Sequence, residues 1–244
     1  MKKLIICILC FASTQAFSQV RLGLTGSFTA ANCWQGENVP GVPTNAITGE
    51  ISTFDAGLVL EYDLGTSGFI LQPSLVYAEN GTHLINRQGF VDNADYVIGL
   101  SDTYMHIYSL RLPVNLVYKF AVTDKWRVFG GIGPYIAKNL SGTEKGYYQV
   151  VYNSTNESAN IPINNTMKAS NDNSYAPAGT FNVNPIDVGA DFLLGISYKR
   201  IDVSASFNRG FTRLYHNQYT TMDNQFWNFT VAYTIAGHYR KPKL

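Results

Sequence analysis

The sequence lacks the long apolar run that a membrane-spanning helix requires. After residue 18, it has no stretch of 18 consecutive apolar residues, whereas a helix needs about 20 to cross a bilayer. Apolar residues spaced three and four apart, which are typical of amphipathic helices, are also scarce. The sequence therefore favours neither a helical membrane protein nor a helical bundle.

Cysteine is equally scarce, with 3 residues in the whole chain. The first two, Cys7 and Cys10, lie in the apolar run 4–12, which follows Lys2 and Lys3. A positively charged start followed by an apolar run is the layout of a secretory signal peptide. Small residues at Ala16 and Ser18 predict cleavage before Gln19, which makes 1–18 the signal peptide and 19–244 the mature domain. Only Cys33 then remains, so an internal disulfide is excluded, and we expect an incidental thiol in a loop.

Charge is low and balanced, which bears on possible partners. Charged residues make up 14% of the chain and the formal net charge is +1, or about −1 once Lys2 and Lys3 are removed. A protein that binds nucleic acid normally carries a basic excess. We therefore predict no nucleic-acid partner.

Motifs for catalysis or metal binding are also missing. The 4 histidines are far apart: His83 and His216 fall in expected loops, His106 near a strand end and His238 in the tail. The chain contains neither a His-x-x-x-His nor a Cys-x-x-Cys spacing, and it has no Gly-x-Ser-x-Gly elbow. We predict no enzyme activity, no catalytic residues, no metal site and no cofactor.

Aromatic residues and strict alternation of apolar and polar residues are abundant. The chain has 16 Tyr, 14 Phe and 3 Trp. Near the start, Leu22, Leu24 and Phe28 alternate with polar neighbours, which predicts a strand with one apolar and one polar face. Eight such runs occur, most of about 9 to 13 residues, enough for a tilted strand to cross a bilayer: 20–30, 54–63, 69–78, 104–120, 126–136, 188–198, 201–207 and 229–235.

The connections between these runs alternate in length. Short ones at 65–68, 121–125 and 199–200 separate long ones at about 31–53, 81–103, 139–186 and 210–225. A membrane barrel has short periplasmic turns and long extracellular loops. The sequence therefore predicts an all-β fold, an eight-stranded antiparallel transmembrane up-and-down β-barrel with both termini in the periplasm.

The polar faces distinguish a membrane barrel from a soluble one. They are rich in Gly, Ser, Thr and Asn, whereas a soluble exterior carries about 25 to 35 percent charged residues. We therefore place the apolar faces against lipid and the polar faces in the lumen. We expect nine lumenal charges to form a structural polar network, with an ion or proton pathway as the alternative: Arg21, Asp55, Glu61, Arg111, Lys119, Arg127, Asp187, Asp191 and Asp202.

Five segments of the mature chain have a recognisable pattern: 21–28 (RLGLTGSF), 71–77 (LQPSLVY), 107–120 (IYSLRLPVNLVYKF), 128–138 (VFGGIGPYIAK) and 187–210. Their order and spacing resemble the PorT-like outer-membrane β-barrel family of Gram-negative bacteria, porin-like barrels of the cell envelope. The resemblance covers nearly all of the mature chain and implies an outer-membrane barrel. Members of the family differ in role, and only some take part in protein secretion.

Three functions remain open from the sequence. The first is a structural or interaction barrel whose extracellular loops bind other envelope proteins or surface ligands, with outer-membrane lipid around the wall. The second is a narrow pore for ions or small solutes, or a component associated with protein secretion. The third is a membrane-embedded hydrolase, for which no site motif is present.

The signal-peptide assignment makes a direct prediction. Protein extracted from the outer membrane should begin at Gln19, because the A-x-S pattern ends at Ser18. Intact-mass measurement of the purified protein checks this, and a mass that includes Met1 to Ser18 would contradict it.

Overall fold

The computed structural model describes residues 20–37, 46–65, 67–92, 95–152, 155, 157–170, 178–216 and 220–237. The expected signal peptide therefore lies outside the described residues. Within them the fold is all-β, and no helix is long and apolar enough to cross a membrane. Eleven strands form one sheet: β1 (Val20–Glu37), β2 (Ala46–Gly49), β3 (Ile51–Asp63), β4 (Phe69–Asp92), β5 (Asp95–Ala121), β6 (Trp126–Tyr152), β7 (Ser158–Ala169), β8 (Thr180–Val183), β9 (Ile186–Tyr198), β10 (Ile201–His216) and β11 (Thr220–Ala236).

Eight of these strands close into a ring in the order β1, β3, β4, β5, β6, β9, β10, β11, with every pair antiparallel. The ring closes where β11 pairs with β1 from Leu22↔Ala236 to Glu37↔Thr220. Strands that follow one another in the ring also follow one another in sequence, apart from the short β2, β7 and β8. The predicted eight-stranded up-and-down barrel is confirmed.

The alternation in sequence becomes two faces of the barrel wall. On β3, the even-numbered residues from Ser52 to Tyr62 are exposed, whereas Thr53, Asp55 and Glu61 face inward and are buried. The outward face is strongly apolar, as Phe54 and Leu194 show with 72% of each side chain exposed. Such a face is stable only against lipid.

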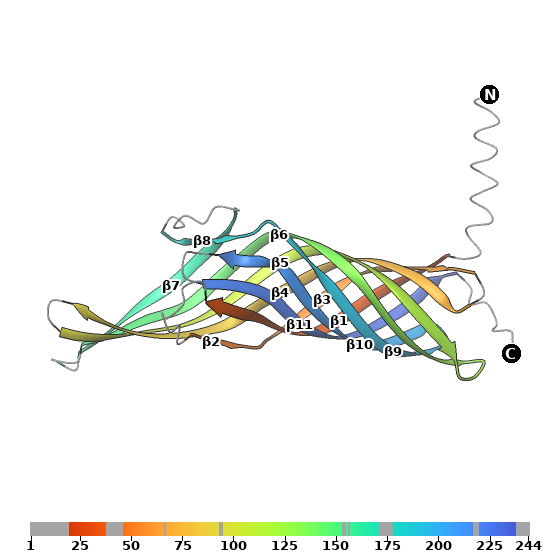
Figure 1. Cartoon of the computed structure of the whole chain (residues 1–244), viewed down its shortest axis with the longest axis horizontal. Helices are drawn as coiled ribbons and strands as arrows, with labels where there is room; N and C mark the ends of the chain where they lie inside the picture. The colour runs from red at the N-terminus through yellow and green to blue at the C-terminus, as the bar shows by residue number, and fades with distance from the viewer. Residues whose placement is uncertain are drawn as a thin grey trace, which may run out of the picture.

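The short connections lie at one end of the barrel. The connections from β3 to β4, from β5 to β6 and from β9 to β10 share this end with the start of β1 and the finish of β11 (Figure 1). At the opposite end, β4 to β7 reach well beyond the ring, and β2 and β8 add to the sheet there. We call this projecting sheet, formed by β2, β7, β8 and the distal halves of β4, β5 and β6, the extracellular extension.

The sequence pattern placed several strand ends too early. Most of 81–103 was expected to be loop, yet β4 and β5 continue as a paired hairpin to Asp92↔Asp95. Likewise, β1, β10 and β11 extend through much of 31–53 and 210–225, and β6, β7 and β8 occupy much of 139–186. Outside the membrane both faces of a strand can contact water, so polar residues occur on both faces. The alternation of apolar and polar residues that predicts a strand is then lost.

Candidate functional site

At the periplasmic end, the lumen is crossed by a cluster of buried charges. Arg21 on β1 contacts Glu61 on β3 at 2.9 Å between Nε and Oε2. Its two terminal nitrogens contact the Asp63 carboxylate at 2.6 and 2.8 Å. This fork geometry matches a guanidinium to a carboxylate and is the strongest arrangement for such a pair.

Lys119 extends this cluster to the other side of the barrel. Its Nζ lies 2.6 Å from Glu61 Oε1 and 2.6 Å from Asp202 Oδ2, and 5.0 Å from the centroid of the Phe129 ring. Strands β3, β5 and β10 are thereby linked across the lumen, because none of the three is adjacent to another in the ring. We call Arg21, Glu61, Asp63, Lys119 and Asp202 the periplasmic ion cluster.

A second polar network lies further towards the outside. Arg111 Nη2 donates a hydrogen bond to Asp55 Oδ2 at 2.9 Å, and its guanidinium lies over the Phe226 ring. The Asp187 carboxylate accepts hydrogen bonds from Tyr135 and Asn224 at 3.1 and 2.7 Å, and also from the hydroxyl of Thr212. A carboxylate with three donors is well satisfied even where water is scarce.

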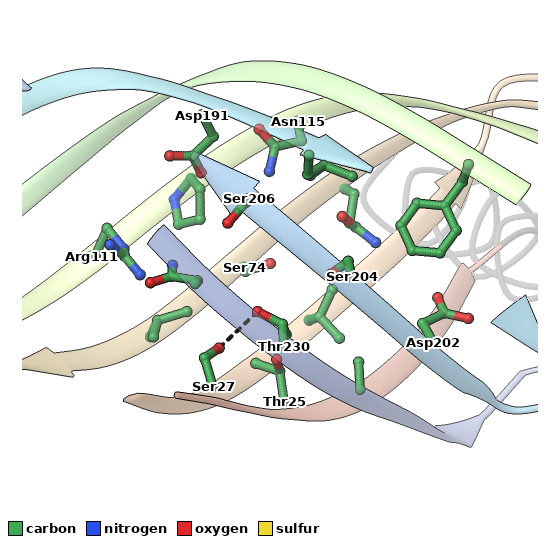
Figure 2. A pocket seen from close by; sticks show the side chains of 18 residues that line it. Thr25, Ser27, Ser74, Arg111, Asn115, Asp191, Asp202, Ser204, Ser206 and Thr230 are labelled. Atoms are coloured by element: carbon green, nitrogen blue, oxygen red, sulfur yellow. Dashed lines mark hydrogen bonds between the residues drawn. The ribbon is translucent and has the colours of Figure 1, made fainter. Parts of the chain in front are cut away.

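Between the two networks is a polar cavity of about 90 Å³ (Figure 2). Arg111, Asp191 and Asn115 line one end, and Asp202 lines the other. Most of the remaining polar lining is hydroxyl groups, from Thr25, Ser27, Ser74, Ser204, Ser206 and Thr230. A polar cavity of this size holds water, which bridges groups that the protein leaves unpaired.

Several buried atoms around this cavity have no hydrogen-bond partner in the described part of the chain. They are Nε and Nη1 of Arg111, and one oxygen each of Asn115, Asp191 and Asp202. Donors and acceptors are both represented, so the lining carries no preference for one sign of charge. Such a mixture suits water better than a selective ion path.

The extracellular end of the lumen is closed by apolar packing. Strand β8 folds into the barrel mouth, where Phe181 and Val183 are buried against residues from β1, β5, β10 and β11. We call this cluster the apolar plug; its members are Cys33, Met105, Ile107, Phe181, Val183, Leu214 and Met222, with Leu84 and Met167 packed against it. Apolar side chains packed across a narrow lumen oppose the passage of hydrated ions.

The structure corrects the expectation for Cys33. It is not an accessible loop thiol but lies in β1 within the apolar plug, with 0% of the residue exposed. Cys33 lies outside the membrane-spanning part of β1. The outward residues of β1 are apolar up to Ala30, and the next outward residue, Asn32, is polar. Burial raises the pKa of the Cys33 thiol to about 12, and the carboxylates of Asp187 and Asp223 raise it further.

Eight of the nine charges selected from the sequence are buried in the lumen. Seven of them make the contacts described above, and the eighth, Asp191, lines the polar cavity. Arg127 is instead half-buried at the periplasmic rim of β6. The sequence selection missed Asp63 and Tyr135. Asp63 continues the inward alternation of Asp55 and Glu61, and this signal was available. Tyr135 follows a stretch rich in glycine that obscured its face.

Two of the histidines, His83 and His106, lie in strands and contact carboxylates. Among the described residues, no three of His, Cys, Asp and Glu are close enough to hold a metal ion. His83 was expected in a loop but lies in β4, where its Nε2 is 2.7 Å from Asp102 Oδ1. His106 Nδ1 lies 2.8 Å from Glu79 Oε1. His238 lies outside the described residues.

Comparison with known proteins places this architecture among outer-membrane barrels. A family model described as "Outer membrane protein beta-barrel domain" matches residues 11–216. Similar solved structures include OprG from Pseudomonas aeruginosa (11% identity, 90% of this chain and 98% of that chain, TM-score 0.43). Another is Ail of Yersinia pestis, solved with the heparin analogue sucrose octasulfate (9% identity, 88% and 99%, TM-score 0.31). No curated protein matches the chain.

The periplasmic ion cluster predicts the effect of one substitution. Lys119→Met should lower the free energy of unfolding by about 3 kcal/mol, because it leaves Glu61 and Asp202 buried with less compensation. Urea unfolding of the folded barrel in detergent measures this change. Lys125→Met, in an exposed turn, serves as the control and should change stability by less than about 0.5 kcal/mol. Equal effects of the two substitutions would contradict the prediction.

The apolar plug predicts the reactivity of Cys33. In folded protein at pH 8, the thiol should resist a maleimide reagent, because it is buried and its pKa of about 12 leaves little thiolate. Labelling should become fast in denaturant, as a gel shift with a polymer-linked maleimide will show. The double substitution Phe181→Ala and Val183→Ala should speed labelling of the folded barrel. Rapid labelling of the folded wild type would rule out this packing.

Proposed function

Because this chain belongs to the outer-membrane protein β-barrel domain family, we propose that it is a non-enzymatic barrel that acts by binding partners through its extracellular extension. The observation that carries the proposal is the contrast between the lumen of the barrel and the extracellular extension. The lumen holds two networks of buried charges, a small polar cavity and the apolar plug, whereas the extension exposes a large area of sheet.

The lengths of the strands support a role outside the membrane. Strands β4, β5 and β6 have 24, 27 and 27 residues, whereas crossing the membrane takes about 9 to 11. More than half of each strand is therefore available outside the bilayer. Building and ordering this sheet has a large entropic cost that a simple membrane anchor would not require.

The most exposed part of the extension is β7. Nine of its 12 residues are exposed, and Ile161 has 52% of its side chain exposed. In the described part of the chain, residues 158–165 pair only with β6. A strand edge with unpaired backbone groups and exposed apolar side chains is a typical binding surface for another protein.

The resemblance to PorT-like barrels adds a finer proposal, that the partner is another envelope protein, including one associated with protein secretion. A narrow pore is the main alternative, and it would require the apolar plug to move. A membrane-embedded hydrolase is the third candidate. Among the described residues no histidine joins the lumenal network, and the one threonine hydroxyl that donates to Asp187, that of Thr212, also accepts from the backbone N–H of Val188.

Photo-cross-linking in intact cells tests the proposal. A photoreactive amino acid at Ile161 should give discrete adducts with protein partners, because this side chain points into the surroundings of the extension. The same probe at Leu194, which is 72% exposed on the barrel wall, should give adducts with lipid alone. Identical adduct patterns at the two positions would overturn the interaction role.

Planar-bilayer recording separates the pore alternative. The wild-type barrel should remain silent, because the apolar plug excludes hydrated ions. The variant Phe181→Ala with Val183→Ala is the control. It enlarges the apolar plug's narrow passage and should give brief conductance events, which would show that the recording can detect an open barrel. Steady conductance by the wild type would replace the interaction proposal with the pore.

A further inference from the structure

The outward face of the barrel shows where polar residues first interrupt the lipid-facing apolar band. Going outward, the first polar outward residue is Lys138 after Ile136 on β6, and Arg209 after Phe207 on β10. Exposed apolar side chains continue beyond these two positions, at Leu140 and Phe211. The other strands of the ring also carry a first polar residue at the outer end of their apolar face. The first polar outward residues form a ring at the outer rim, namely Asn32, Ser52, Glu79, His106, Lys138, Arg209 and Gln225.

Charge is distributed unevenly around this rim. On the β4 and β5 side, the outward groups are two pairs of a histidine and a carboxylate. On the β6 and β10 side they are cations: Lys138, Arg209 and Arg213, which we call the basic rim. Asp223, 3.9 Å from Arg209, offsets one of these three charges. The basic rim therefore carries a net charge of about +2.

Two of these cations, Lys138 and Arg213, lie on strands that flank β9 on opposite sides. Lys138 pairs in register with Ile186 of β9. On the other side of β9, Thr212 donates to Asp187 and accepts from the Val188 backbone, which places Arg213 beside Ile186. One strand separates β6 from β10, so their backbones are about 10 Å apart and the two long side chains can meet over Ile186.

Neither cation is held by a close contact. Lys138 and Arg213 are exposed, and the described residues offer them no hydrogen bond or salt bridge at contact distance. Arg213 does pair in register with Asp223 of β11, the acid that also lies 3.9 Å from Arg209. The net positive charge that remains after this offset is available to an anion from outside the protein.

The surface next to the basic rim is strongly apolar. Phe211 lies between Arg209 and Arg213 on β10 with 69% of its side chain exposed, and Ile136 and Val188 are 47% and 37% exposed. All three face outward, where the barrel meets lipid. A ligand that fits this surface has an anionic head group at the rim and hydrocarbon chains below it.

We propose that the basic rim binds the phosphate of an outer-leaflet lipid through Lys138 and Arg213, with the acyl chains of that lipid lying along Phe211, Val188 and Ile136. The position selects a lipid over a protein partner, because these residues face sideways at the level of the head groups. Guanidinium and ammonium groups form charge-assisted bonds to phosphate oxygens. This site is separate from the extracellular extension and does not depend on the function proposed for it.

Titration of the folded barrel in detergent with diphosphorylated lipid A, followed by native mass spectrometry, tests this site. The double variant Lys138→Ala and Arg213→Ala should bind at least about tenfold more weakly, since two charge-assisted bonds are lost. The wild type should also bind dephosphorylated lipid A at least about tenfold more weakly than the diphosphorylated form. Inorganic phosphate at millimolar concentration should not compete, because it lacks the acyl chains.

The controls separate local binding from folding and from general charge. Lys145→Ala removes an exposed cation further out on the same strand and should leave lipid A binding unchanged. Lys138→Arg with Arg213→Lys keeps both charges and should retain binding, and heat-modifiability on gels verifies that each variant is folded. The proposal fails if the double alanine variant binds like the wild type, if Lys145→Ala weakens binding equally, or if phosphate removal has no effect.

Discussion

The structure depends on one constraint: inside the hydrocarbon layer, every backbone N–H and C=O group must find a partner in the protein. A sheet meets this requirement only by closing on itself. The pairing of β11 with β1 removes the last two edges of the ring. Once the ring is closed, every strand has one face towards lipid and one towards the lumen, and the alternation of apolar and polar residues follows from that geometry.

Closure also decides what the lumenal residues can do. Eight strands leave an interior narrow enough for side chains to fill, so charges from opposite walls meet directly. Lys119 bridges Glu61 and Asp202 in this way, and the Asp187 carboxylate gathers donors from three strands. Where side chains do not fill the space, a polar cavity remains for water. The apolar plug then separates this wet interior from the outside.

Beyond the membrane the constraint is relaxed, because water can satisfy a free strand edge. This is why β7 can stand with an exposed edge and why β4, β5 and β6 can project so far. The outer rim of the barrel marks the boundary between the part inside the membrane and the part outside it. At the basic rim, apolar and cationic side chains lie side by side, as they must where hydrocarbon gives way to charged head groups.

The sequence by itself determined the all-β class, the eight membrane-crossing strands, the face of most residues within the barrel wall and the end that carries the short turns. These features follow from local period and polarity: Asp202 is inward because it alternates with Ile201 and Val203. Only the tertiary structure decided that Lys119 meets Asp202, 83 residues away, that β8 closes the mouth around Cys33, and that Lys138 and Arg213 flank one strand. These contacts depend on register and on closure of the ring, which join distant segments and leave no trace in local composition.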